Sequence, residues 1–179
     1  MSLLTGNQKF IQVALKYAFS LFGIPKTGQT IVYPAGDDGT YQAGYPKTGA
    51  RFTDNGDGTI TDNATGLMWV KDGTGAGCNS GNKLGVYDTI DFCEALNFAG
   101  HADWRLPNIT ELVSIIDYGV AAPRIDTLFI NTAADRYWSS TTDKQAPTNC
   151  ATGNFSTGSV DWEFILASYS LRPVRGGRV

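Results

Sequence analysis

The chain has few of the residues that most often carry out catalysis. Its single histidine is His101, and its three cysteines, Cys78, Cys93 and Cys150, lack the paired short spacings of a zinc site. No cysteine lies close to His101 in the sequence, so a capping or surface role explains this histidine better than a Cys/His nucleophilic pair. These residues argue against an enzyme and give no reason to expect a metal or cofactor.

Positive charge and long apolar runs are also scarce. Lysine and arginine together number 14 against 17 aspartates and glutamates, a formal net charge of -3. The chain therefore has no broad positive field, which makes nucleic acid and anionic membrane surfaces poor partners. No run reaches the roughly 18 uninterrupted apolar residues of a membrane helix, so we expect no membrane insertion.

The residues that are present suffice for one hydrophobic core. The 179 residues are 42% hydrophobic and 12% aromatic, as in a single domain of ordinary size. With 21 glycines and few long periodic segments, the sequence predicts many turns and short strands rather than a helical bundle. We expect one domain over residues 25–179, preceded by a short segment, residues 1–24.

Residues 1–24 contain the most apolar stretch of the chain, NQKFIQVALKYAFSLFG. Polar side chains recur there every four residues, so a helix would have one narrow polar stripe, formed by Gln8, Gln12, Lys16 and Ser20. Such a helix would pack on its own domain or against copies of itself, and the second alternative predicts a homo-oligomer. A truncated export signal is a third interpretation, although no small-x-small cleavage site follows the stretch.

Asn55-Gly56 and Asp57-Gly58 lie between residues of strand type and predict a tight β-hairpin. The preceding residues, 25–52, have the glycine and proline content of a linker or extended loop. An EF-hand calcium loop is excluded, because its first and last ligand positions would fall on Thr53 and Ala64. A looser calcium site stays open as the alternative, built from Asp54, Asp57 or Asp62.

A helix is predicted between Val86 and Gly100. Apolar side chains recur at helical spacing through Ile90 and Cys93, and Asp88 is the candidate N-cap. Gly100 is a residue type that often follows the end of a helix. One face of this helix is therefore expected to pack on the core.

The stretch DWRLPN, residues 103–108, precedes a second predicted helix. Asn108 is a good N-cap, Glu111 completes a capping box, and Gly119 ends the helix. No nucleophile or base accompanies Asp103 and Arg105, so we interpret them as bracing groups, paired with each other or with neighbouring loops. A structural role is therefore assigned to Asp103, Trp104, Arg105, Asn108 and Glu111, and to Trp138, which we expect in the core.

Four motifs follow one another in the order FTDNGDGTITDNATGLMW, FCEALNFAGHADWRLPNITELVSIID, YWSSTT and LRPVRGG. Together they resemble the Lcl C-terminal domain family, which ends a bacterial collagen-like adhesin and occurs in many secreted proteins. The likeness extends from about Pro25 to the C-terminus. More distantly, RLPNITEL and LRPVRGG are similar to motifs of the formylglycine-generating-enzyme group within the C-type lectin fold.

The resemblance implies a C-type lectin-like α+β domain with two helices, a small twisted antiparallel sheet and long loops that present a ligand surface. It also implies a secreted or cell-surface protein of bacterial or phage origin. Formylglycine-generating enzymes use reactive cysteines near the C-terminus, where this chain has LRPV, and calcium-dependent lectins use Glu-Pro-Asn or Gln-Pro-Asp triplets, which are absent. The remaining catalytic alternative is a degenerate or uncharacterised enzyme of the formylglycine-generating type that uses Cys150 or Cys93.

A similarity to the variable proteins diversified by retroelements, which end in a similar RPVR, implies a ligand face near the C-terminus. Trp162 is the best surface candidate, because Asp161 and Glu163 flank it in an expected loop and would accept hydroxyl hydrogen bonds beside its ring. The implied face comprises Thr142, Asp143, Lys144, Asn149, Asn154, Asp161, Trp162, Glu163 and Tyr169. An ordinary solvated loop surface is the alternative.

The preferred hypothesis is therefore a non-catalytic, adhesin-like module that recognises a glycan or protein. The adhesin resemblance suggests a trimer, and also glycosaminoglycan binding, for which the only clustered cations are Arg172, Arg175 and Arg178. Arg172 and Arg175 would point to opposite faces of a strand and would not form one patch. Because exported domains meet an oxidising compartment, the resemblance implies a disulfide between Cys78 and Cys93 or, as the rival pairing, between Cys93 and Cys150.

Overall fold

The computed structural model describes residues 23–46 and 51–176. The apolar stretch Phe10–Phe22, predicted to be a helix, lies outside these ranges, so its fold and its role in assembly stay predictions. The described elements are, in chain order, α2 (Asp38–Tyr41), β1 (Phe52–Asp54), β2 (Thr59–Asp62), β3 (Leu67–Val70), the 3-10 helix η1 (Ala76–Gly81), α3 (Val86–Ala95), α4 (Ile109–Ser114), β4 (Arg136–Thr142), β5 (Asn149–Asn154), β6 (Val160–Phe164) and β7 (Val174–Gly176).

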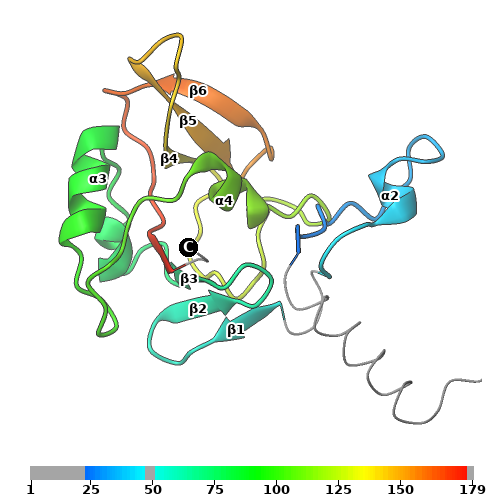
Figure 1. Cartoon of the computed structure of the whole chain (residues 1–179), viewed down its shortest axis with the longest axis horizontal. Coiled ribbons are helices and arrows are strands. Elements are labelled where there is room, and N and C mark those ends of the chain that lie inside the picture. Colours follow the sequence, from blue (N-terminus) through cyan, green and yellow to red (C-terminus); the bar gives the residue numbers. More distant parts are fainter. Residues whose placement is uncertain (1–22, 47–50, 177–179) are drawn as a thin grey trace, which may run out of the picture.

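The strands form two small antiparallel sheets (Figure 1), with the orders β1-β2-β3-β7 and β4-β5-β6. β7, from the end of the chain, pairs with β3 and sets Val174 opposite Trp69. The first sheet is thus closed by a strand from the end of the matched LRPVRGG motif. The predicted α+β class with antiparallel strands is confirmed, although the strands are divided between two sheets.

β1 and β2 form the predicted hairpin, with Asn55–Gly58 as its loop. Gly56 and Gly58 have φ angles of 79° and 90°, a left-handed conformation that glycine adopts without strain. The Asp57 carboxylate closes the loop by accepting the Thr59 N–H at 3.0 Å. The Asn-Gly and Asp-Gly pairs are therefore explained by turn chemistry.

α3 and α4 are the two predicted helices, with boundaries that differ from the predicted ones. The N-cap of α3 is Gly85, so Asp88 lies inside the first turn, and the helix ends at Ala95, well before Gly100. α4 ends at Ser114 rather than near Gly119, because the chain turns away there and the Asp117 N–H donates to the Arg124 carbonyl at 2.8 Å. Neither these helices nor any other in the described ranges is long and apolar enough to cross a membrane.

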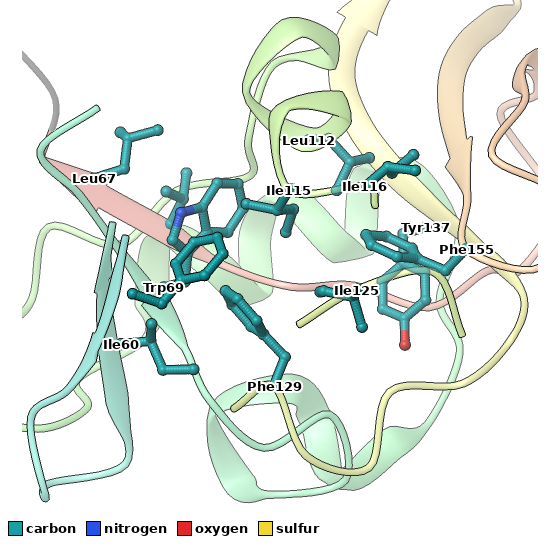
Figure 2. Packing of buried hydrophobic residues seen from close by; sticks show 12 residues of the cluster. Ile60, Leu67, Trp69, Leu112, Ile115, Ile116, Ile125, Phe129, Tyr137 and Phe155 are labelled. Atoms are coloured by element: carbon teal, nitrogen blue, oxygen red, sulfur yellow. The ribbon is translucent and has the colours of Figure 1, made fainter. Parts of the chain in front are cut away.

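The largest hydrophobic cluster fills the space between the two sheets and α4 (Figure 2). Ile60 and Trp69 come from the first sheet and are completely buried. They pack with three more side chains of the first sheet and with side chains of α4, of the three-stranded sheet and of the loops, namely Phe52, Leu67, Val174, Leu112, Ile115, Ile116, Ile125, Phe129, Tyr137 and Phe155. This core fixes α4 over one face of the β4-β5-β6 sheet, where Leu112 lies against Gly153 of β5.

A second cluster covers the other face of the same sheet. Trp138, next to Tyr137 in β4, points the opposite way and packs under α3 with Val86, Cys93, Leu106, Cys150 and Leu171. The predicted core position of Trp138 is confirmed: it is completely buried and its indole N–H donates to the Leu84 carbonyl at 2.8 Å. The sheet therefore lies between α3 and α4, which pack on β4 and β5, and β6 is left at its edge.

Candidate functional site

The polar side chains of the DWRLPN stretch, residues 103–108, bind other groups of the chain. The Asn108 side chain accepts the Glu111 N–H and the Glu111 carboxylate accepts the Asn108 N–H, both at 2.9 Å, which confirms the capping box. Arg105 binds the same carboxylate through two bonds of 2.8 and 2.6 Å. Burial raises the pKa of Glu111, but the hydrogen bonds from Arg105 and Asn108 outweigh it and hold this pKa below its ordinary value.

Asp103 and Arg105 do not pair with each other, and each braces another part of the molecule. Asp103 accepts two hydrogen bonds from Arg175 of β7, at 2.6 and 3.1 Å. Trp104 is buried, and its indole N–H donates to the Phe98 carbonyl at 3.1 Å. Through these contacts the stretch joins α4 to β7.

Trp162 lies in the middle of strand β6, not in the loop expected from the sequence. Side chains alternate between the two faces of a strand, so Val160, Trp162 and Phe164 share one face. They are 46%, 50% and 51% exposed. This exposed row, which we call the β6 surface, contains two residues that the sequence analysis missed, although the alternation of VDWEF was a usable strand signal.

Asp161 and Glu163 lie on the opposite face of β6 from Trp162. Glu163 accepts the Tyr169 hydroxyl at 2.9 Å and lies 2.9 Å from Nε of Arg136, which is also 3.5 Å from Asp161. Burial raises the pKa of Tyr169, and the neighbouring Glu163 carboxylate raises it further. The predicted arrangement of carboxylates around the Trp162 ring is therefore corrected, because strand alternation separates them.

The other predicted ligand residues are divided between the two ends of the β5-β6 hairpin. Thr142, Asp143 and Lys144 belong to the end of β4 and the loop after it, and Asn149 pairs with Phe164, so this group lies at the Phe164 end of the β6 surface. Asn154 lies at the opposite end, is 7% exposed and accepts the backbone N–H groups of the following turn, including that of Ser156 at 2.9 Å. Asn154 is therefore a turn residue and does not join the exposed face.

All three cysteines are free and buried, and the predicted Cys78–Cys93 bridge is not formed. Cys78 packs with Val70 and Trp104, whereas Cys93 and Cys150 belong to the separate cluster under α3. Burial raises the pKa of Cys78 to about 11 and that of Cys93 to about 12. These thiols are held protonated, which is the opposite of an activated cysteine nucleophile.

The arginines near the C-terminus form no exposed basic cluster among the described residues. Arg172 is completely buried and donates to the Val70 and Lys71 carbonyls at 2.6 and 3.0 Å. Arg175 is bound to Asp103 at 2.6 Å, and Arg178 lies outside the described ranges. Two of the three charges on which the glycosaminoglycan interpretation was based are thus engaged within the chain.

The aspartates of the open calcium alternative also have partners. Asp54 binds Lys71 at 2.6 Å, and Asp57 accepts the Thr59 hydroxyl at 2.6 Å. Asp62 is completely buried in an ion pair with Arg51, at 2.9 Å. Across residues 23–46 and 51–176, no group of three or more histidine, cysteine or acidic side chains is arranged to hold a metal ion.

Comparison with protein-family models matches residues 58–175 to the Lcl C-terminal domain. No curated protein matches the sequence. The matched range runs from the loop of the β1-β2 hairpin to β7, and it includes the capping box, both large helices and the β6 surface. The chain therefore belongs to the Lcl C-terminal domain family.

Proposed function

We propose that this domain is a non-catalytic recognition module of a secreted or surface-exposed bacterial protein, and that it binds a glycan or protein ligand through the β6 surface. The single observation that carries the proposal is the row of half-exposed side chains at Val160, Trp162 and Phe164. Contiguous apolar side chains on an exposed strand are costly to leave in water and often mark an interaction site. An exposed tryptophan is also the residue type most enriched among binding hot spots.

The residues around this row give the surface its polar margin. Thr142, Asp143, Lys144 and Asn149 surround the Phe164 end, where Asn149 pairs with Phe164. An aromatic centre with a polar rim is the usual composition of a recognition surface. The DWRLPN stretch has no comparable exposed aromatic group, since Trp104 is buried.

A cysteine enzyme is not favoured. Catalytic cysteines are kept reactive by nearby positive charge or a helix N-terminus and are accessible to substrate. Cys93 is completely buried with its pKa raised to about 12, and Cys150 lies in the same hydrophobic cluster. These surroundings fit core residues rather than nucleophiles.

Arrays of glycans and proteins probed with the purified chain test the proposal. Trp162→Ala should weaken binding to the hits by about 2 kcal/mol or more, the range of an aromatic hot spot. Tyr41→Ala is the control, because Tyr41 is an exposed aromatic residue, 72% exposed against 50% for Trp162, in α2, which lies away from β6 in Figure 1. Binding that is lost with Tyr41→Ala or Arg105→Ala but kept with Trp162→Ala would refute the assignment of the surface.

We further propose that the protein is a homo-oligomer, with a trimer as the first expectation, assembled through the apolar sequence of residues 10–22. The support is the narrow polar stripe of that sequence, which leaves most of a helix surface needing cover. Light scattering of the full chain, compared with a chain that starts at residue 23, tests this. A full chain that stays monomeric at high concentration would refute it.

A further inference from the structure

Strand β6 has one paired edge and one free edge. Among the residues that the structure describes, it pairs only with β5 and is the last strand of its sheet. At one end of the pair the Asn154 N–H donates to the Ser159 carbonyl at 2.9 Å, and at the other the Ile165 N–H donates to the Thr148 carbonyl at 2.9 Å. Because such bonds involve every second residue of an antiparallel strand, Asp161 and Glu163 direct their backbone groups toward β5.

It follows that Val160, Trp162 and Phe164 direct their backbone groups away from the sheet. The Phe164 carbonyl is taken by the Ala167 N–H at 2.8 Å. Within the described ranges, no residue bonds the N–H and C=O groups of Val160 and Trp162 or the N–H of Phe164. The three residues with exposed side chains are thus the same three that offer backbone donors and acceptors at a free edge, which is a template for another strand.

The charge on the opposite face of β6 indicates what kind of strand would fit. The Asp161 and Glu163 carboxylates face a single guanidinium, that of Arg136, at 3.5 and 2.9 Å, so negative charge is in excess. Both carboxylates keep solvent access, with 34% and 23% of their side chains exposed. A basic side chain on an added strand would complete this cluster, since opposite charges on paired strands attract and like charges repel.

A second copy of β6 does not fit this requirement. An antiparallel pair of β6 strands centred on Trp162 would place Asp161 of one copy opposite Glu163 of the other, twice in the same interface. Like charges directly opposite one another destabilise a strand pair. The acidic face therefore favours a different, basic partner over self-association at this edge.

We propose that an extended segment of a partner protein, with alternating apolar and basic residues, adds antiparallel to β6 as the fourth strand of the β4-β5-β6 sheet. Its apolar side chains pack along Val160, Trp162 and Phe164, and its basic side chains lie beside Asp161 and Glu163. Its backbone bonds the outward groups of Val160 and Trp162, as in other cases of strand addition. This rests on the proposed function and specifies the class of ligand that the β6 surface takes.

The test uses the full chain and an eight-residue peptide of alternating lysine and valine with blocked ends. Titration should show binding, with slowed hydrogen exchange of the Val160, Trp162 and Phe164 amides and little change at Asp161 and Glu163, which already bond β5. In an antiparallel pair, the peptide valines that lie opposite Val160, Trp162 and Phe164 would direct their own N–H and C=O groups toward β6, and the lysines would direct theirs away. N-methylation of the valines should therefore abolish binding, and N-methylation of the lysines should leave it intact.

Two further experiments test the charge of the partner strand and the role of the free edge of β6. A peptide with glutamate in place of lysine should bind at least about tenfold more weakly, because each carboxylate of β6 would face a like charge. Val160→Pro, which removes an outward N–H from the edge, should weaken binding about tenfold, and Val160→Ala less. Strand addition would be overturned if the glutamate peptide or the valine-methylated peptide bound as tightly as the unmodified lysine-valine peptide. It would also be overturned if no peptide bound. Glycan binding that depends on Trp162 would then still support the proposed function.

Discussion

Trp162 and Glu163 are consecutive residues of β6 and serve opposite faces of the sheet. The Trp162 side chain is 50% exposed on the face that α4 covers further along the sheet. The Glu163 carboxylate is bound on the other face, to the Tyr169 hydroxyl and to Arg136, both at 2.9 Å. One strand thus carries a polar cluster on one side and an apolar surface in contact with water on the other.

The two tryptophans of the three-stranded sheet should differ sharply in their contribution to stability. Trp138→Ala removes a completely buried side chain and should lower the free energy of unfolding by about 3–5 kcal/mol. Trp162→Ala removes a half-exposed side chain and should lower it by less than about 1 kcal/mol. Urea denaturation of both variants measures the difference. If Trp162→Ala cost as much as Trp138→Ala, Trp162 would be a core residue and the β6 surface would not exist.

Loss of the α4 cap should destabilise the chain without affecting recognition. Asn108→Ala removes the acceptor of the Glu111 N–H and should lower the free energy of unfolding by about 1 kcal/mol. Thr110→Ala is the control, because this exposed residue lies in the same turn outside the capping box, and its effect should stay within about 0.5 kcal/mol. Ligand affinity of the folded protein should be unchanged in both variants. A loss of affinity with Asn108→Ala alone would indicate that the DWRLPN stretch, rather than the β6 surface, binds the ligand.

The hydrogen bonds that the Glu111 carboxylate accepts should make the free energy of unfolding depend on pH in the acid range. The pKa of this carboxyl lies below its ordinary value of 4.5 in the folded chain, so the ionised form stabilises the fold. That contribution is fully present above pH 4.5 and is lost as the pH falls through the folded pKa. Denaturation midpoints measured between neutral pH and pH 3 should fall more steeply for the parent chain than for Glu111→Gln. Parallel curves for the two proteins would contradict the assignment.

The cysteines should be inert in the folded protein. With pKa values near 11 and 12 for Cys78 and Cys93, almost no thiolate is present at pH 8, and burial blocks access. A chromogenic disulfide reagent should therefore react slowly with the native chain and should titrate all three thiols after unfolding. A thiol that reacts faster in the native protein than in the unfolded one would contradict this prediction and favour the cysteine-enzyme alternative.

The features that the sequence predicted correctly are those whose partners lie within a few residues. The loop of the β1-β2 hairpin depends on glycines that adopt positive φ, and the capping box of α4 joins Asn108 to Glu111. Both are local hydrogen-bond and backbone effects, so residue type and spacing suffice to predict them. The ordered motifs also identified the family, which the match over residues 58–175 confirms.

The amino-acid sequence by itself determined the β1-β2 turn, the start of α4, the α+β class and the presence of one tryptophan between two acids. Only the tertiary structure decided that Trp162 lies on an edge strand, that Asp161 and Glu163 turn away from it toward Arg136, and that Arg105 and Asp103 bind different partners. These outcomes depend on strand pairing and on contacts between distant parts of the chain, such as Asp103 with Arg175. Local residue patterns do not specify such partners, because the free energy that selects them comes from burial of the whole core.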